Sequence, residues 1–185
     1  MTFAEQLRRN AAANEAYVKL HYSKEIFISD TAQYKFSCRY LKGLVIPKGV
    51  KMAESRIPRS SDQRNILRKE LRQAGILAKM GYSVYLIPEN AGYKIKPKDA
   101  IVNGQLFEFR NITGNEKTLE WQFRDAKKKG ADTNIFINID SNINRHEAQR
   151  RVGNVLRRHP EYTGKIIMSF NNGENVYFWN TENLR

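Results

Sequence analysis

The chain has little cysteine and no long run of apolar residues. Its 185 residues include a single cysteine, Cys38, so neither an internal disulfide nor a cysteine-based zinc site can form. No segment approaches the roughly 20 consecutive apolar residues of a transmembrane helix, and residues 2–10 are polar where a secretory signal needs an apolar core. Internal repeats are absent as well. We therefore expect no membrane span and a cytoplasmic site of action.

Acidic residues are scarce relative to basic ones. The chain carries 32 Lys and Arg against 19 Asp and Glu, which gives a formal net charge of +13 and a pI near 9.9. A hydrophobic fraction of 41% is enough to build a core. Basic side chains gain binding free energy when they displace counterions condensed on phosphates. A nucleic acid is therefore the expected partner, with catalysis left undecided by charge alone.

Residues 1–62 are predicted to form an N-terminal helix followed by an irregular extension. Apolar and small residues recur at near-helical spacing over 3–20, with Thr2 placed as N-cap and Glu5 placed to complete a capping box. We expect a domain boundary near residue 62. Two short β-prone runs and a linker-like run follow the helix, at 25–29, 34–41 and 57–62.

Residues 63–185 show a clearer alternation of helical and strand patterns. Asn103-Gly104 and the run 171–173 are typical of hairpin turns between β-prone segments. The pattern predicts an α/β (α+β) fold, a mixed β-sheet flanked by helices in the order α-β-β-β-α-β-α-β-β. Helices are expected at 66–78, 118–129 and 145–158, and strands at 82–87, 100–102, 105–112, 134–139, 165–170 and 175–179.

Four ionisable residues fall at informative places in this pattern: Glu70, Asp99, Glu108 and Arg110. Residues two apart on a strand share a face, so Glu108 and Arg110 point one way and the flanking phenylalanines point into the core. Asp99, on the neighbouring strand, would add its carboxylate to the face of Glu108. Two convergent carboxylates can hold Mg²⁺ or Mn²⁺, which neutralises phosphate charge and lowers the pKa of a bound water. A solvated cross-strand ion pair is the alternative interpretation.

The same residues resemble a known nuclease core. Asp99 followed by Glu108-x-Arg110, in the order α-β-β-β-α-β, resembles the PD-(D/E)XK core, whose motif reads Asp…Glu-x-Lys. Residues 64–180 also resemble the C-terminal nuclease domains of contact-dependent growth inhibition and other polymorphic toxins, and of related phage or mobile-element proteins. The motifs that carry this resemblance are the helical pattern at 70–84, LIPE at 86–89, DAIVNG at 99–104, EFRNITGN at 108–115 and NIFINID at 134–140.

The resemblance implies roles for these residues by position. Asp99 and Glu108 become metal ligands, and Glu70 becomes an additional acidic ligand from the helix. Arg110 takes the position of the family's lysine. Arginine stays protonated and cannot transfer a proton, although its charge can still stabilise a transition state. A weakly active, a naturally inactive and a deliberately attenuated protein therefore all remain open.

Basic and hydroxyl residues beyond this strand supply candidate contacts to nucleic acid. In a chain of net charge +13, clusters of Lys and Arg fit a groove that follows phosphates. Hydroxyl groups near the start of the next helix can join its backbone amides in binding an anion. The predicted contacts are Thr113, Thr118, Lys127, Lys128, Lys129, Arg145, Arg150 and Arg151.

Three functions are compatible with these features. The first is a metal-dependent, toxin-type endonuclease that hydrolyses phosphodiesters in RNA, with tRNA implied by the resemblance. The second is a metal-independent RNase of the barnase/EndoU/colicin/RelE type, which uses the 2′-hydroxyl as nucleophile with Arg110, Thr113 and Thr118. The third is a non-catalytic nucleic-acid-binding protein of a mobile element. A toxin would also imply an acidic immunity protein over the basic cleft and delivery as part of a larger effector.

Overall fold

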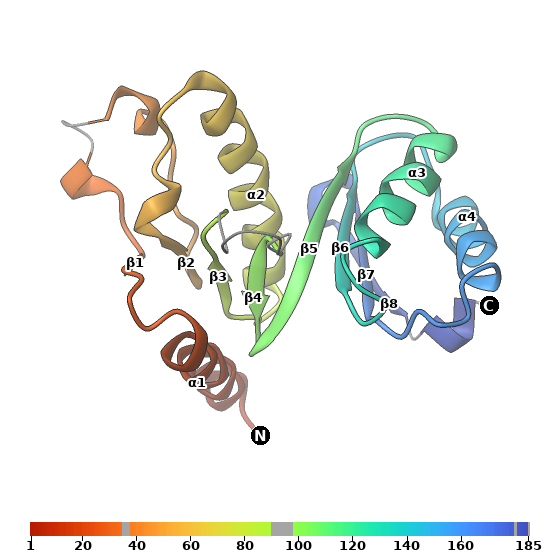
Figure 1. The fold of residues 1–185 in the computed structure, drawn as a ribbon, viewed down its shortest axis with the longest axis horizontal. Helices are drawn as coiled ribbons and strands as arrows, with labels where there is room; N and C mark the ends of the chain where they lie inside the picture. The colour runs from red at the N-terminus through yellow and green to blue at the C-terminus, as the bar shows by residue number, and fades with distance from the viewer. Residues whose placement is uncertain (35–37, 90–97, 180, 185) are drawn as a thin grey trace. The chain divides into compact units, whose positions relative to one another are not determined.

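Short strands alternate with longer helices along the chain. The computed structural model describes residues 1–34, 38–89, 98–179 and 181–184, and these contain four α-helices and eight β-strands. The chain divides into two compact units, Met1–Leu106 and Phe107–Arg185, both visible in Figure 1. Parallel and antiparallel strand pairs occur together. The predicted α/β class with a mixed sheet and flanking helices is therefore confirmed.

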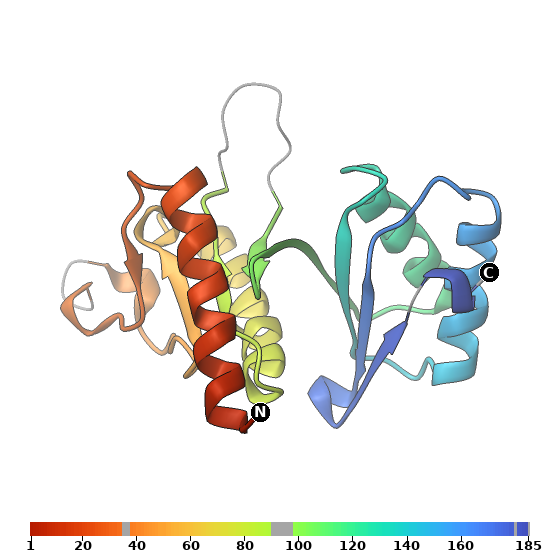
Figure 2. The ribbon, with the colours of Figure 1, turned by 90° about the horizontal axis from the view of Figure 1, so that it is seen from below.

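The first unit is built on four paired strands. Its elements are α1 (Phe3–His21), β1 (Phe27–Ile28), β2 (Val50–Ala53), α2 (Ser61–Lys79), β3 (Val84–Leu86) and β4 (Ala100–Val102), with 3-10 turns at Ala32–Tyr34, Arg39–Leu41 and Glu54–Arg56. The strands hydrogen-bond in the order β1-β2-β3-β4. β2 and β3 are parallel, and the other two pairs are antiparallel. Figure 2 shows α1 and α2 on opposite sides of these strands.

Helix α1 begins and docks through specific polar contacts. The predicted capping box is present, because the Thr2 hydroxyl accepts from the Glu5 amide at 3.2 Å and the Glu5 carboxylate accepts from the Thr2 amide at 2.6 Å. Further along, the buried Asn14 donates to the Ser83 carbonyl at 2.7 Å and accepts from the Gly104 amide at 2.7 Å. The helix is thereby held against the Asn103-Gly104 turn, whose residues both have positive φ as a two-residue hairpin turn requires.

The second unit places two helices on one face of a mostly parallel sheet. Its elements are β5 (Gln105–Ile112, which begins in the first unit), α3 (Glu116–Lys127), β6 (Asn134–Ile139), α4 (Arg145–Arg157), β7 (Ile166–Phe170) and β8 (Asn175–Trp179), with 3-10 turns at Asn171–Gly173 and Thr181–Leu184. β5, β6 and β7 are parallel and β8 is antiparallel to β7. Alternate residues of β6 pack against Phe123 of α3 and Val152 of α4 in a single core cluster. Asn115 and Asn144 cap the two helices.

The N-terminal sixty residues differ most from the sequence prediction. The strand expected at 34–41 is wrong for its described residues, which form 3-10 turns instead, while residues 35–37 lie outside the described residues. A strand that the pattern did not predict, β2, pairs in parallel with β3, so that Val50 lies opposite Val84. Residues on both sides of position 62 therefore share one sheet, and the division of the chain into compact units falls after Leu106.

Replacing Tyr162 with phenylalanine is expected to lower the free energy of unfolding by about 1–2 kcal/mol. Tyr162 is fully buried between the sheet and α3, its ring lies edge-on to Phe123, and its hydroxyl donates to the Thr133 carbonyl at 2.5 Å. Burial raises the pKa of Tyr162 far above its ordinary value, so the hydroxyl remains a donor. Urea unfolding of both proteins measures the difference, and equal midpoints would contradict it.

Candidate functional site

Glu108 and Arg110 lie on the face of β5 that packs toward α3. Phe107 and Phe109 are 3% and 4% exposed and alternate with them, as the period of a strand requires. The predicted sharing of one face by Glu108 and Arg110 is confirmed by their direct ion pair. Glu108 is 0% exposed. A fully buried carboxylate on a β-strand is unusual, because burial of a charge is unfavourable unless cations accompany it.

Two cations accompany the buried carboxylate, one on each oxygen. Arg110 pairs with Oε1, and the ammonium of Lys129, just beyond the end of α3, lies 2.7 Å from Oε2. Arg110 also contacts the Asp125 carboxylate at 3.1 Å and donates to the Phe109 carbonyl at 3.1 Å. Side chains of two acidic and two basic residues thus form one compact group, which we call the Glu108 cluster: Glu108, Arg110, Asp125 and Lys129.

The donor chemistry of the Glu108 cluster suits a hard divalent cation only in part. Carboxylate oxygens are the ligands that Mg²⁺ and Mn²⁺ prefer, and Glu108 supplies two of them. Both oxygens already face a cation. Within the described ranges, no three His, Cys, Asp or Glu residues gather as a metal-binding group. An ion at Glu108 would therefore take the place of a side-chain cation, and the ammonium on the flexible Lys129 side chain is the easier one to displace.

Glu70 and Asp99 belong to a second charged cluster, in the first unit. The guanidinium of Arg56, whose side chain is 2% exposed, pairs with Glu70 and lies 3.4 Å from the Glu89 carboxylate. It also donates to the carbonyls of Ile87 and Asp99 at 3.2 and 3.3 Å. Arg56 thus joins α2 to the ends of β3 and β4, beside a cleft of about 300 Å³ lined in part by Arg56 and Glu89.

The four residues predicted as a catalytic group fall into these two clusters. Glu70 and the Asp99 backbone are joined through Arg56 in the first unit, and Glu108 and Arg110 are paired in the second. The expected approach of the Asp99 and Glu108 carboxylates to one another stays a prediction. Arg56 and Asp125 were missed by the sequence reasoning. Neither carries a periodic or motif signal, since one ends a 3-10 turn and the other lies among helix-surface residues.

Several of the predicted nucleic-acid contacts are engaged by carboxylates. Arg150 and Arg151 both pair with Glu147, at 2.7 and 3.0 Å, and Lys127 lies 3.9 Å from Glu161. Hydrogen bonds from the two arginines lower the pKa of Glu147 below its ordinary value, which keeps it charged and paired. Arg145 instead lies over the Tyr177 ring, 4.0 Å from its centroid. Phosphate would have to compete with these partners, whereas Lys128 is simply exposed.

Thr113 directly follows β5, and Thr118 lies in the first turn of α3. An extended chain rises about 3.3 Å per residue, so Thr113 is about 17 Å along the strand from Glu108. Thr113 lines a pocket of about 420 Å³ between the starts of α3 and α4, and Thr118 donates its backbone amide to the Asn115 cap at 3.2 Å. The structure therefore does not bring these two hydroxyls to the Glu108 cluster.

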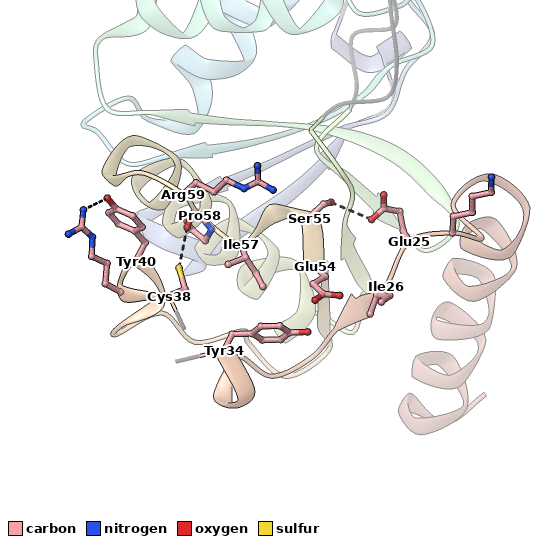
Figure 3. A pocket seen from close by; sticks show the side chains of 12 residues that line it. Glu25, Ile26, Tyr34, Cys38, Tyr40, Glu54, Ser55, Ile57, Pro58 and Arg59 are labelled. Atoms are coloured by element: carbon pink, nitrogen blue, oxygen red, sulfur yellow. Dashed lines mark hydrogen bonds between the residues drawn. The ribbon is translucent and has the colours of Figure 1, made fainter. Parts of the chain in front are cut away.

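The most voluminous pocket among those described lies in the first unit, and none of the predicted site residues lines it. It measures about 970 Å³ and is drawn in Figure 3, where Cys38 donates to the Pro58 carbonyl at 3.2 Å. Its lining mixes acidic, basic and aromatic side chains from residues 24–59. This is the part of the chain to which the resemblance assigns no role.

No protein-family model, curated protein or solved structure matches this chain. The residues and their contacts therefore carry the functional interpretation. Among the described residues, no helix combines the length and the apolar character that a membrane crossing needs.

Proposed function

We propose that this chain is a toxin-type endonuclease that cleaves phosphodiester bonds in RNA with the help of Mg²⁺ or Mn²⁺. The main support is the Glu108 cluster. A carboxylate that is 0% exposed, with Arg110 and Lys129 on its two oxygens, combines a hard-cation ligand with two groups able to bind a phosphate. Groups of this kind stabilise the charge that develops during phosphoryl transfer.

The energetics of the Glu108 cluster also favour a functional role. Burying an ion pair often contributes no net stability, because desolvation offsets the Coulomb attraction. Apolar residues would fill the same space on β5 at a lower desolvation cost. Charged groups kept in such a place are therefore candidates for chemistry.

The order of elements gives a second, weaker support. From Ser61 the chain runs α2-β3-β4-β5-α3-β6, with β5 and β6 parallel. This is the order in which the PD-(D/E)XK core places its acidic residues on the second and third strands. Asp99 immediately precedes β4 and Glu108 lies in β5, which is consistent with a PD-(D/E)XK-like assignment for this part of the chain.

Each residue has a defined part in this proposal. Glu108 is the ligand that the Glu108 cluster supplies to the divalent cation, and the resemblance to the PD-(D/E)XK core adds Asp99 and Glu70 as the other acidic ligands. The ion, when bound, supplies positive charge to the phosphate and a more acidic water. Arg110 holds Glu108 in place, because it is also tied to Asp125 and to its own strand, and adds charge. Lys129 provides an ammonium that can turn to the phosphate.

One observation favours a second candidate, a metal-independent RNase. Both oxygens of Glu108 are balanced by side-chain cations, so the cluster is electrically complete without any added ion. Cleavage through the 2′-hydroxyl would then rely on Arg110 and Lys129 for charge stabilisation. Cleavage of total tRNA with Mn²⁺, repeated in EDTA, separates the two candidates: metal dependence requires that the chelator stop the reaction.

Replacing Arg110 with lysine is expected to raise the rate of RNA cleavage by about tenfold or more, because lysine keeps the positive charge and can also take part in proton transfer. The rate is measured on labelled tRNA with Mn²⁺. Arg124→Lys, in an exposed arginine paired with Glu120 at 3.0 Å, is the matched control and should leave the rate unchanged. If neither the native chain nor Arg110→Lys cleaves RNA while both bind it, the non-catalytic alternative is correct.

A toxin of this type would need an acidic immunity protein for its producer to survive. The net charge of +13 makes an acidic inhibitor the complementary partner. The neighbouring reading frame should then encode an acidic protein that binds this chain and blocks cleavage in a mixing assay.

A further inference from the structure

The excess of positive charge is concentrated in the first unit. Residues 1–106 carry 19 Lys and Arg against 9 Asp and Glu, a net charge of +10, whereas residues 107–185 carry 13 against 10, a net charge of +3. The contacts predicted from the sequence all lie in the second unit. The electrostatic attraction for a polyanion is therefore strongest in a part of the chain to which no contact has been assigned.

Helix α2 presents a row of arginines on its outer side. Arg64, Arg68 and Arg72 follow one another at i, i+4 and i+8, which places them along one side of a helix. Arg68 and Arg72 are exposed and Arg64 is half-buried. The opposite side of α2 is buried, with Ala74 and Leu77 both 0% exposed. The charged side is therefore the one that faces solvent.

Helix α2 has no acidic residue at the positions that would pair with this row. None of the positions three or four residues from Arg64, Arg68 or Arg72 is acidic, and Glu70 points into the unit toward Arg56. Like charges four residues apart destabilise a helix. The arginines of α4 differ, because both Arg150 and Arg151 have Glu147 as a partner within one turn. The charges of the three arginines are therefore not cancelled by an acidic residue one turn away on α2, and they add to the net positive charge of the first unit.

Further basic residues lie near both ends of α2. Near its start, Arg64 donates to the carbonyl of Lys42 at 2.9 Å, and Lys42 is exposed. Near its end, Lys79 and Lys48 are exposed, and Gly49 approaches Ala78 so closely that an added Cβ would lie 3.3 Å from the Ala78 Cβ. At 1.5 Å per residue, Arg64 and Arg72 are about 12 Å apart along α2, and Lys79 lies beyond the buried Gly75, against which Pro47 packs.

We propose that this arginine row of α2 (Arg64, Arg68 and Arg72) binds the phosphate backbone of the RNA substrate. The identity of the polyanion as RNA rests on the proposed function, whereas the location of the contact rests on the helix itself. The row holds the RNA by charge and without regard to base sequence. Base or structure preference, if the enzyme has any, then belongs to other residues.

The test measures RNA binding separately from cleavage. Labelled tRNA is titrated with the full chain in EDTA from 0.05 to 0.3 M salt, and a gel verifies that the probe stays intact. Each lost phosphate contact lowers the salt slope of the binding constant by about 0.7–0.9. The triple variant Arg64→Gln, Arg68→Gln, Arg72→Gln should therefore lose about 2 units of slope and about 30-fold or more in affinity at 0.1 M salt.

A second triple variant controls for the loss of three charges. Lys117→Gln, Arg124→Gln and Lys165→Gln removes three exposed cations from the second unit and should change tRNA affinity by less than about threefold. Equal losses of tRNA affinity in the two triple variants would overturn the proposal. An unchanged salt slope of the binding constant in the α2 triple variant would do the same. So would equal affinity of the native chain for a plasmid duplex, since RNA would then not be the preferred occupant.

Two further measurements distinguish a loss of RNA binding from a loss of folding and from a loss of RNA cleavage. Thermal melting by circular dichroism verifies that each variant folds. If the triple variant melts at a lower temperature than the native chain, the single variant Arg68→Gln, at an exposed position, replaces it. Its salt slope of tRNA binding should then fall by about 0.7. If the α2 triple loses binding but the native chain cuts no RNA, the row stands and the nuclease proposal fails. If the native chain cuts RNA and the triple binds it normally, the row fails and the nuclease proposal stands.

Discussion

Replacing Glu108 with glutamine is expected to abolish RNA cleavage while leaving RNA binding nearly intact. The substitution keeps the size of the side chain but removes the charge that faces Arg110 and Lys129. A neutral amide is a poor ligand for Mg²⁺ or Mn²⁺, and it no longer holds the two cations in a fixed arrangement. We expect the cleavage rate to fall at least about a hundredfold, measured as single-turnover rates on labelled tRNA with Mn²⁺.

A second glutamate in the same unit provides the control. Glu120 is 19% exposed on its side chain and pairs with Arg124 and Arg151, so Glu120→Gln also removes a partly buried, paired carboxylate. Its cleavage rate should stay within about threefold of the native rate. Filter binding of tRNA reports whether Glu108→Gln has damaged the fold or the binding surface. Cleavage by a well-folded Glu108→Gln protein at the native rate would remove Glu108 from the reaction.

The parts of the fold that follow from local rules could be predicted from the sequence. The turns at 103–104 and 171–173 combine Asn and Gly at positions of positive φ, and such residues are recognisable because few others tolerate this conformation. The helices have caps and apolar stripes whose period is visible without any tertiary information. Strand β2 has neither a characteristic turn nor a visible apolar period. It is four residues long, and its parallel partner begins 34 residues later, at Val84.

The part of the candidate site that depends only on the two-residue period of a β-strand could be predicted from the sequence. Glu108 and Arg110 share a face because they are two residues apart, and this needs no knowledge of the rest of the fold. The contact of Lys129 with Glu108 depends on the length of α3, which returns the chain to the start of β5. Lys129 was therefore recognised only as one lysine of a basic cluster. Arg56 gave no signal at all, since its partners are 14 to 43 residues away.

Replacing Arg56 with methionine is expected to destabilise the fold far more than replacing a surface arginine. Methionine fills much of the space of the arginine stem but leaves the buried Glu70 carboxylate without its guanidinium. It also removes the side-chain donor to the Ile87 carbonyl, while the Asp99 carbonyl keeps its hydrogen bond from the Ile87 amide. Removing one member of a buried ion pair destabilises proteins by about 3–5 kcal/mol. Urea unfolding of the full chain measures this loss. Arg59→Met, at an exposed arginine three residues later, should change stability by less than about 0.5 kcal/mol.

The double substitution Arg56→Met with Glu70→Leu separates stability from function. Because the buried carboxylate is removed together with its partner, most of the lost stability should return. If Glu70 serves only to bind Arg56, the double variant cleaves RNA at the native rate. If Glu70 is also a ligand of the divalent cation, the double variant is stable but slow, and a higher Mn²⁺ concentration restores part of its rate. A double variant no more stable than Arg56→Met would show that the Ile87 carbonyl, rather than Glu70, accounts for the need for Arg56.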